Sequence, residues 1–326
     1  MKTRLLFKGK NLLAALLLLA ALPGCDTAVD LPEPPHTPRI ALTYTLSNTA
    51  PAMLFVSSSQ RIFETRPLSG RDDATVEIRD GQGTVVERFR SVGSGPNQFG
   101  PGSYEPILGL RGQPGQTYTL RAAVPGLETA ESTLTMPLPP VIESAAFTPR
   151  ANDPNSQTNL TRGRLQITVA DNGRTTDYYL AFARVLDKQG NPGNWSSVVL
   201  DGSSEGDDFA VDRFQLSSGN SYGGYGIYPY PDTNVNGQRV SLNSNVSFYS
   251  QLFCDPNQSS CPEAGYLEVS VQSITADTYN FYQSQRRYVD GGGSPFAEPA
   301  PLASNIRPGY GLFGGAAEAS YRVRLF

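Results

Sequence analysis

The chain has 326 residues with a formal net charge of −4, and it contains 32 Gly, 26 Pro and 16 Tyr but only 17% charged residues. Such a composition is typical of globular, β-rich proteins with many turns. A net acidic surface repels phosphate backbones, which excludes nucleic acid as an expected partner.

A lipoprotein signal peptide is predicted over residues 1–24. Four basic residues precede an unbroken apolar run from Leu12 to Leu22. This is the layout of a secretory signal peptide, and the run is too short to span a bilayer. The next residues, LPGC, resemble the bacterial lipobox, in which cleavage precedes an acylated cysteine. We therefore expect Cys25 to carry acyl chains such as palmitate, each buried CH₂ contributing about 0.8 kcal/mol to anchoring. An ordinary cleaved signal with an incidental cysteine is the alternative.

Residues 25–39 are predicted to be a lipidated, proline-rich tether, because the segment 26–38 holds four prolines and reads as an extended spacer. Loss of the signal peptide removes four basic residues and no acidic ones, so the mature chain has 22 basic and 30 acidic residues and a formal charge of −8. Its length of about 300 residues favours two domains over one core.

Residues 40–138 are predicted to form an Ig-like β-sandwich. Ile40, Leu42, Tyr44 and Leu46 alternate with smaller or polar residues, which is the period of a half-buried strand. The stretch ATVEIRDGQGTVVERF predicts a hairpin with DGQG at its turn, and QTYTLRAAV and ESTLTMPL predict further strands. Several short antiparallel strands with Gly and Pro between them close most economically into a sandwich.

Residues 139–326 are predicted to form a second β-rich domain with one short helix. The domain boundary is placed in the proline-rich segment 136–149. Strands are predicted in GRLQITVAD, DYYLAFARVLD, WSSVVL, VSFYSQLF and YLEVSVQSI. The helix is expected near 276–288, with Thr275 as its N-cap and with Tyr279 and Tyr282 on one face.

Two cysteines remain after Cys25, and both lie in FCDPNQSSCPEAG. Because turn-forming residues separate Cys254 from Cys261 in a chain predicted to be exported, we expect a disulfide that closes a small loop. A metal site is the alternative, but no second cysteine pair and no histidine lie nearby in the sequence.

A tyrosine-rich stretch, SYGGYGIYPYPDTN, suggests recognition of a ligand or partner. Tyr222, Tyr225, Tyr228 and Tyr230 lie among glycines and prolines, and such rigid amphipathic rings can stack on sugar or peptide. The simpler interpretation is that two or more of these rings cover the sheet, because tyrosine is commonly half-buried.

The stretch SPFAEPAPLASNIRPGYGLFGG, residues 294–315, carries a family resemblance. It is similar to the carboxy-terminal signature of the domain of unknown function 4249 family of Bacteroidota outer-membrane lipoproteins, although Ser294 stands where that family has asparagine. The lipobox and the stretches ATVEIRDGQG, GQTYTL, DYYLAF and ITADTYNFYQS also match. The resemblance implies a β-rich fold, an outer-membrane location and association with TonB-dependent receptors, but no reaction. The signature positions are Pro295, Phe296, Ser304, Asn305, Ile306, Gly311, Phe313 and Gly314.

The same segment has a physical interpretation that does not need the family. Its prolines exclude a regular helix or a central strand, while Phe296, Leu302, Ile306, Leu312 and Phe313 provide apolar side chains to bury. We expect an ordered, proline-rich C-terminal strap over the sheet, in which Asn305 hydrogen-bonds exposed backbone. A ligand-binding loop is the alternative for a long ordered coil.

Catalysis is not expected. The single histidine, His36, lies in the predicted tether, so a histidine-dependent triad or zinc site has no base or ligand. The pairs Asp72–Asp73 and Asp207–Asp208 lie in turn-rich sequence, where solvated turns are the simpler interpretation. DNGRTTD, residues 171–177, lacks the alternating oxygen ligands of an EF-hand loop. No cofactor, metal or catalytic residue is therefore predicted.

Three functions are compatible with these features. The preferred one is a lipid-anchored accessory or binding protein of the outer membrane, on its periplasmic face or at the cell surface, that partners a TonB-dependent receptor in nutrient uptake. A free-standing structural or adhesive surface module is the first alternative. A glycan or peptide hydrolase is the second, and it requires a cleft with paired carboxylates of raised pKa.

Overall fold

The computed structural model describes residues 35–61, 64, 66–93, 100–151, 159–193, 197–201, 214–217, 226–250, 262–291 and 301–325. The chain divides into two compact units, one of residues 1–36 and 61–64 and one of residues 37–60 and 65–326. In the first unit, the Glu64 amide donates a hydrogen bond to the Arg61 carbonyl at 3.1 Å. All strands and the helix below belong to the second unit. Within the described ranges, no helix is long and apolar enough to cross a membrane.

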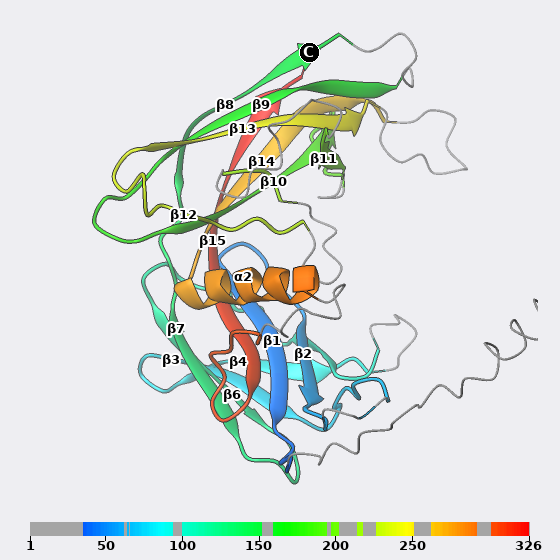
Figure 1. Cartoon of the computed structure of the whole chain (residues 1–326), viewed down its shortest axis with the longest axis vertical. Helices are drawn as coiled ribbons and strands as arrows, with labels where there is room; N and C mark the ends of the chain where they lie inside the picture. Colours follow the sequence, from blue (N-terminus) through cyan, green and yellow to red (C-terminus); the bar gives the residue numbers. More distant parts are fainter. Residues whose placement is uncertain are drawn as a thin grey trace, which may run out of the picture. The chain divides into compact units, whose positions relative to one another are not determined.

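The described residues form an eleven-stranded mixed sheet, a four-stranded antiparallel sheet and one helix, α2 (Ala276–Gly291) (Figure 1). The larger sheet has the order β12-β10-β14-β15-β1-β2-β5-β4-β3-β6-β7 and the smaller has the order β11-β13-β9-β8. The prediction of a mostly β chain with one short helix is confirmed. The strands are β1 (Ile40–Ser47), β2 (Leu54–Ser58), β3 (Thr75–Asp80), β4 (Val85–Ser91), β5 (Ser103–Pro106), β6 (Thr117–Ala123), β7 (Ala130–Thr135), β8 (Val141–Arg150), β9 (Leu160–Ala170), β10 (Tyr178–Asp187), β11 (Val198–Leu200), β12 (Tyr230–Pro231), β13 (Arg239–Tyr249), β14 (Ala264–Ile274) and β15 (Tyr310–Arg324).

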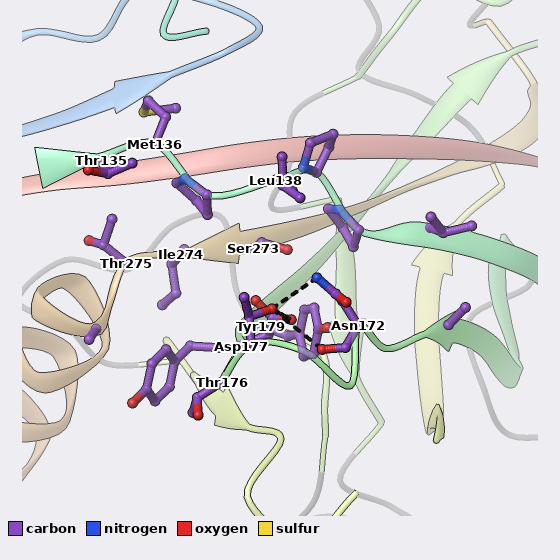
Figure 2. Close-up of a pocket in the computed structure, with 18 residues that line it drawn as sticks. Thr135, Met136, Leu138, Asn172, Thr176, Asp177, Tyr179, Ser273, Ile274 and Thr275 are labelled. Carbon is purple, nitrogen blue, oxygen red and sulfur yellow. Dashed lines mark hydrogen bonds between the residues drawn. The ribbon is translucent and has the colours of Figure 1, made fainter. Parts of the chain in front are cut away.

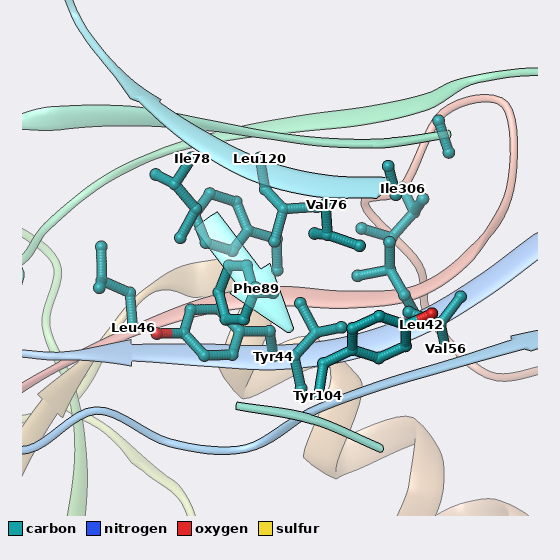
Figure 3. Close-up of a cluster of buried hydrophobic side chains, with 14 of the residues drawn as sticks. Leu42, Tyr44, Leu46, Val56, Val76, Ile78, Phe89, Tyr104, Leu120 and Ile306 are labelled. Atoms are coloured by element: carbon teal, nitrogen blue, oxygen red, sulfur yellow. The ribbon is translucent and has the colours of Figure 1, made fainter. Parts of the chain in front are cut away.

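The first hydrophobic core lies among β1 to β7 (Figure 3). Alternate residues of β1, from Ile40 to Leu46, are at most 1% exposed, so the predicted half-buried strand is confirmed. The Tyr44 ring meets Phe89 edge-on at 5.1 Å and stacks on Phe313 at 6.3 Å between centroids. Full burial of such side chains contributes about 2 kcal/mol each. Phe313 comes from β15, so the end of the chain completes a core built by its beginning.

Strand β15 belongs to both halves of the larger sheet (Figure 1). It pairs in parallel with β1 as far as Ala316, and from Ala316 onward it pairs in antiparallel with β14. Where β1 ends, the Asn48 side chain continues the pairing: it accepts a hydrogen bond from the Glu318 amide at 2.7 Å and donates one to the Glu318 carbonyl at 3.1 Å. Val323 of β15 lies in a second hydrophobic core, which also contains Leu165 of β9, Val185 of β10 and Val269 of β14. The domain ranges 40–138 and 139–326 stay a prediction, and β15 contributes to the cores of both.

The proline-rich segment predicted as a boundary, 136–149, contains most of a strand. Strand β8 begins at Val141, after the three prolines 137, 139 and 140, and it pairs with β9 alone at the edge of the smaller sheet. Pro149 is tolerated there because an edge strand leaves one row of backbone groups without a partner. The placing of a domain boundary in this segment stays a prediction.

The helix begins as predicted. The Thr275 hydroxyl accepts a hydrogen bond from the Thr278 amide at 3.4 Å, and the Thr275 carbonyl accepts one from the Tyr279 amide at 3.0 Å. This is an N-cap, in which a side-chain oxygen satisfies a free amide of the first turn. Tyr279 and Tyr282 both pack against a small cluster that includes Ile274, which confirms the shared face.

The described part of the C-terminal strap, residues 301–309, is irregular and is held in place by hydrogen bonds. Asn305 behaves like a strand partner of β15, because its side chain accepts from the Phe313 amide at 2.9 Å and donates to the Phe313 carbonyl at 2.8 Å. The predicted backbone hydrogen bonds of Asn305 are confirmed. Gly311 has φ +110°, and a Cβ there would lie 1.8 Å from the Leu42 carbonyl oxygen, so close approach of β15 to β1 requires glycine.

Burial of the strap differs in part from the prediction. Ile306, Leu312 and Phe313 are at most 2% exposed, as expected, but Leu302 is 48% exposed. The expectation that Leu302 is buried was therefore wrong. The next residue, Ala303, contacts the helix through its backbone, because its amide donates a hydrogen bond to the Ser284 hydroxyl at 2.8 Å.

Candidate functional site

A cavity of about 550 Å³ lies where three segments of the chain meet (Figure 2). One wall is the segment 135–141, which links β7 to β8. The second is the β9–β10 connection with the first residues of β10, and the third is the junction of β14 and α2. The volume falls within the range of small-molecule sites in proteins.

The walls of the cavity differ in chemistry. Met136, Leu138 and three prolines supply apolar surface, and Figure 2 shows Met136 and Leu138 across the cavity from Asp177 and Asn172. On the polar side, the side-chain NH₂ group of Asn172 donates a hydrogen bond to the Thr175 hydroxyl at 3.0 Å, and that hydroxyl donates one to the Asp177 carboxylate at 2.9 Å. An apolar wall opposite a short hydrogen-bonded chain suits a small amphipathic ligand.

A cluster of three carboxylates adjoins this cavity. Asp171 follows β9, Asp177 precedes β10 and lines the cavity, and Asp232 follows β12. One oxygen from each lies within 4.8 Å of the others. The Asp177 amide donates to the Asp232 carboxylate at 2.8 Å and the Asp232 amide donates to the Asp177 carbonyl at 3.0 Å, so these two residues extend the β10–β12 pairing.

Hydrogen bonds hold the Asp171 carboxylate in place. It accepts one bond from the Tyr179 hydroxyl at 2.5 Å and another from the Gly237 amide at 2.6 Å. Tyr179 is 2% exposed, and burial together with this bond raises the pKa of its hydroxyl far above the usual value. The hydroxyl is therefore a fixed donor to Asp171.

The charge of the cluster is not balanced within the described part of the chain. Asp232 is 0% exposed, and its Oδ1 has no hydrogen-bond partner there. None of the three aspartates forms an ion pair with a described Lys or Arg. At an effective dielectric constant of about 20, two ionised carboxylates at such a separation repel by roughly 3 kcal/mol.

This environment raises the pKa of two of the three carboxyl groups. Burial raises the pKa of Asp177, the hydrogen bond from Thr175 lowers it, and the carboxylates of Asp171 and Asp232 raise it. Burial also raises the pKa of Asp232, with a further contribution from Asp171. The arrangement disfavours three bare negative charges, so it can hold a proton or a cation.

The predicted tyrosine contacts lie elsewhere. Tyr228 and Tyr230 are half-buried: Arg286 of α2 lies over the Tyr228 ring at 5.3 Å, and Tyr230 packs 5.5 Å from Phe214. Neither lines the cavity. Tyr222 and Tyr225 lie outside the described residues, so the ligand-binding prediction for the four tyrosines stays a prediction.

Other predicted site residues are only partly placed. Asp72 accepts bonds from the Gly102 amide at 2.7 Å and the Ser91 hydroxyl at 3.0 Å, while Asp73 pairs with Arg71 at 2.7 Å. Both residues are exposed, and the interpretation of this pair as part of a solvated turn stays a prediction. The following predicted residues lie outside the described ranges: Cys25, Asp207, Asp208, Cys254, Cys261, Pro295 and Phe296.

Sequence reasoning missed the acidic cluster. The stretch 171–177 by itself lacks an EF-hand pattern, and Asp232 lies far from it in the sequence. The β10–β12 pairing brings Asp232 to Asp177 across 55 residues. The only local signal was Asp232 at the end of the YPYP stretch, where an acidic residue is unremarkable in a turn.

Comparison with known proteins gives one family and no characterised relative. The family model described as Domain of unknown function (DUF4249) matches residues 26–322. No curated protein matches the chain.

Proposed function

This chain belongs to the DUF4249 family, and we propose that it is a lipid-anchored, non-catalytic binding protein of the outer membrane that partners a TonB-dependent receptor in nutrient uptake. The observation that carries the binding role is the cavity of about 550 Å³ between the apolar segment 135–141 and the β9–β10 connection. Its mixed walls favour a small ligand with both apolar and hydrogen-bonding surface.

The anchor part of the proposal rests on the sequence. A basic and apolar leader ends in LPGC, and the family match begins at residue 26, directly after Cys25. That boundary agrees with removal of the leader. The proline-rich tether would then hold the first core away from the membrane surface.

The absence of catalysis in this proposal rests on the arrangement of the acidic residues. Glycoside hydrolysis needs one carboxylate that is free to attack or activate water and one that donates a proton across the substrate. Here both oxygens of Asp171 accept hydrogen bonds from the protein. The Asp177 amide donates to the Asp232 carboxylate, and the Asp232 amide donates to the Asp177 carbonyl. Such mutual bonding suits a structural or ion-holding role.

Purification from the native outer membrane tests the partnership. We expect the tagged full chain, extracted in mild detergent, to bring down a TonB-dependent receptor in stoichiometric amount. A Cys25→Ala control is expected to lose the membrane anchor and with it most of the receptor. Recovery of the wild-type chain alone, with residues 26–38 cleaved by protease added to intact cells, would contradict the proposal and favour a free-standing surface module.

Filling the cavity tests the binding role. Leu138→Trp adds volume at the apolar wall, and Leu108→Trp is a matched control because both leucines are 58% exposed and Leu108 does not line the cavity. We expect small molecules that co-purify with the wild type, measured by native mass spectrometry, to be lost only in Leu138→Trp. Equal retention by both variants would place the binding site elsewhere.

A further inference from the structure

We propose that Asp171, Asp177 and Asp232 form a binding site for a divalent cation, and that Ca²⁺ is the ion it suits. The site goes beyond the proposed function and does not depend on it. Three carboxylates from two connections, β9–β10 and β12–β13, converge there, each offering one oxygen within 4.8 Å of the others.

The independent sign of a missing ligand is the side chain of Asp232. It is fully buried, with 0% exposure, and one of its two oxygens has no hydrogen-bond partner among the described residues. Buried polar atoms are almost always satisfied, so an exception calls for an ion, a water or a partner. An oxygen that belongs to a charged group beside two further carboxylates points to a cation in particular.

The protein already orients the other ligands. Tyr179 and the Gly237 amide hold Asp171, and the Thr175 hydroxyl holds Asp177. Each carboxylate oxygen has two lone pairs, so an oxygen that accepts one hydrogen bond can still coordinate an ion. Outer hydrogen bonds that fix ligand orientation are a regular feature of metal sites.

The donor type and the irregular arrangement of the ligands favour calcium. Carboxylate oxygens are hard ligands, which suit Ca²⁺ and Mg²⁺ rather than softer metals. Ca²⁺ accepts irregular arrangements of oxygen ligands, whereas Mg²⁺ demands a near-ideal octahedron. The three oxygens lie within 4.8 Å of one another, which leaves an ion within reach of all three after small adjustments of the side chains.

Occupation of the site would join the two sheets. Asp171 extends from β9 of the smaller sheet, whereas Asp177 and Asp232 flank β10 and β12 of the larger sheet. An ion held by all three would fix the β9–β10 connection, which forms the polar wall of the cavity. With three carboxylates in the site, we expect a dissociation constant of about 10⁻⁴ to 10⁻³ M, the range of extracellular calcium modules.

Calorimetric titration of the full chain in detergent, after removal of metals with a chelator, tests the site with CaCl₂ as the probe. We expect one Ca²⁺ per chain and binding at least tenfold weaker for Mg²⁺. Asp232→Asn should abolish the signal, whereas Asp73→Asn, which makes the same charge change in an exposed turn, should retain it. Absence of Ca²⁺ binding to the wild type at millimolar concentration would overturn the proposal, as would unchanged binding by Asp232→Asn.

A second measurement keeps the test valid if Asp232→Asn fails to fold. Tb³⁺ can replace Ca²⁺, and its luminescence is sensitised by a nearby tyrosine; here the Tyr179 hydroxyl contacts Asp171 at 2.5 Å. We expect sensitised emission from the wild type that Ca²⁺ displaces, and at least a severalfold weaker emission from Tyr179→Phe. Emission from the folded wild type that does not change in Tyr179→Phe would place the ion elsewhere and overturn the proposal.

Discussion

Two buried acidic residues of this protein, Glu87 and Asp232, are both 0% exposed, but the hydrogen bonding of their carboxylates differs. Both oxygens of Glu87 are satisfied by backbone amides, at distances from 2.6 to 3.0 Å. Asp232 has one oxygen satisfied by an amide and the other unpaired, with two more carboxylates beside it. The donors to Glu87 are the amides of Arg88, Ile107, Leu108 and Leu110.

The difference shows how burial of a charge is compensated. Four fixed amide dipoles can replace the water that a carboxylate loses, so Glu87 is complete within the polypeptide. Among the described residues no comparable set of amides surrounds Asp232, and the neighbouring carboxylates of Asp171 and Asp177 add repulsion. We infer that Glu87 holds the loop after β5 in place, whereas the Asp232 cluster is built for a partner that the described part of the chain does not supply.

The largest loss of stability is expected from substitution of Glu87. Glu87→Gln replaces one accepting oxygen by an NH₂ group, which faces backbone donors and leaves at least one of them unsatisfied. We expect the free energy of unfolding to fall by about 3 kcal/mol, measured by urea denaturation and unchanged by added Ca²⁺.

The control for that variant is Glu131→Gln, which removes an equivalent charge from a side chain that is 54% exposed and paired with Arg121. Its cost should be under about 1 kcal/mol, as for other exposed ion pairs. Equal losses in the two variants would show that the amide donors to Glu87 are not what stabilises it.

A smaller loss of stability is expected from substitution of Asn305, an uncharged side chain whose polar atoms are hydrogen-bonded. Asn305→Ala removes both bonds to the Phe313 backbone and leaves that amide and carbonyl without their partner. We expect a loss of about 2 kcal/mol in thermal or urea unfolding. Asn243→Ala, which removes an exposed bond to Gln166, should change stability little, and a similar loss there would argue against a special role for Asn305.

Local features of the fold could be predicted from the sequence because they depend on near neighbours. Alternation from Ile40 to Leu46 marked β1, Thr275 marked the start of α2, and DGQG marked the β3–β4 turn. In that turn Asp80 accepts bonds from the amides of Gln82 and Thr84. Asn305 was also identified, since asparagine in a turn-rich segment commonly bonds backbone.

The features that were missed depend on pairing between distant segments. Nothing local to β15 indicates that it lies parallel to β1, about 270 residues earlier. Likewise, Asp171 and Asp177 resembled an ordinary polar turn until the pairing of β10 with β12 placed Asp232 beside them. The site is a product of topology, which one sequence without its relatives does not reveal.

Binding of a cation by the Asp232 cluster is tested most directly by thermal unfolding of the full-length wild type and of Asp232→Asn, each in chelator and in excess CaCl₂. We expect the order of stability of the two proteins to reverse between these conditions. In chelator the variant should match or exceed the wild type, because one repelling charge is gone. In Ca²⁺ at a hundredfold excess over Kd the wild type should gain roughly 5 °C and become the more stable protein. If Asp232→Asn is less stable than the wild type by the same margin in both conditions, the cluster does not bind Ca²⁺ and the proposal is wrong.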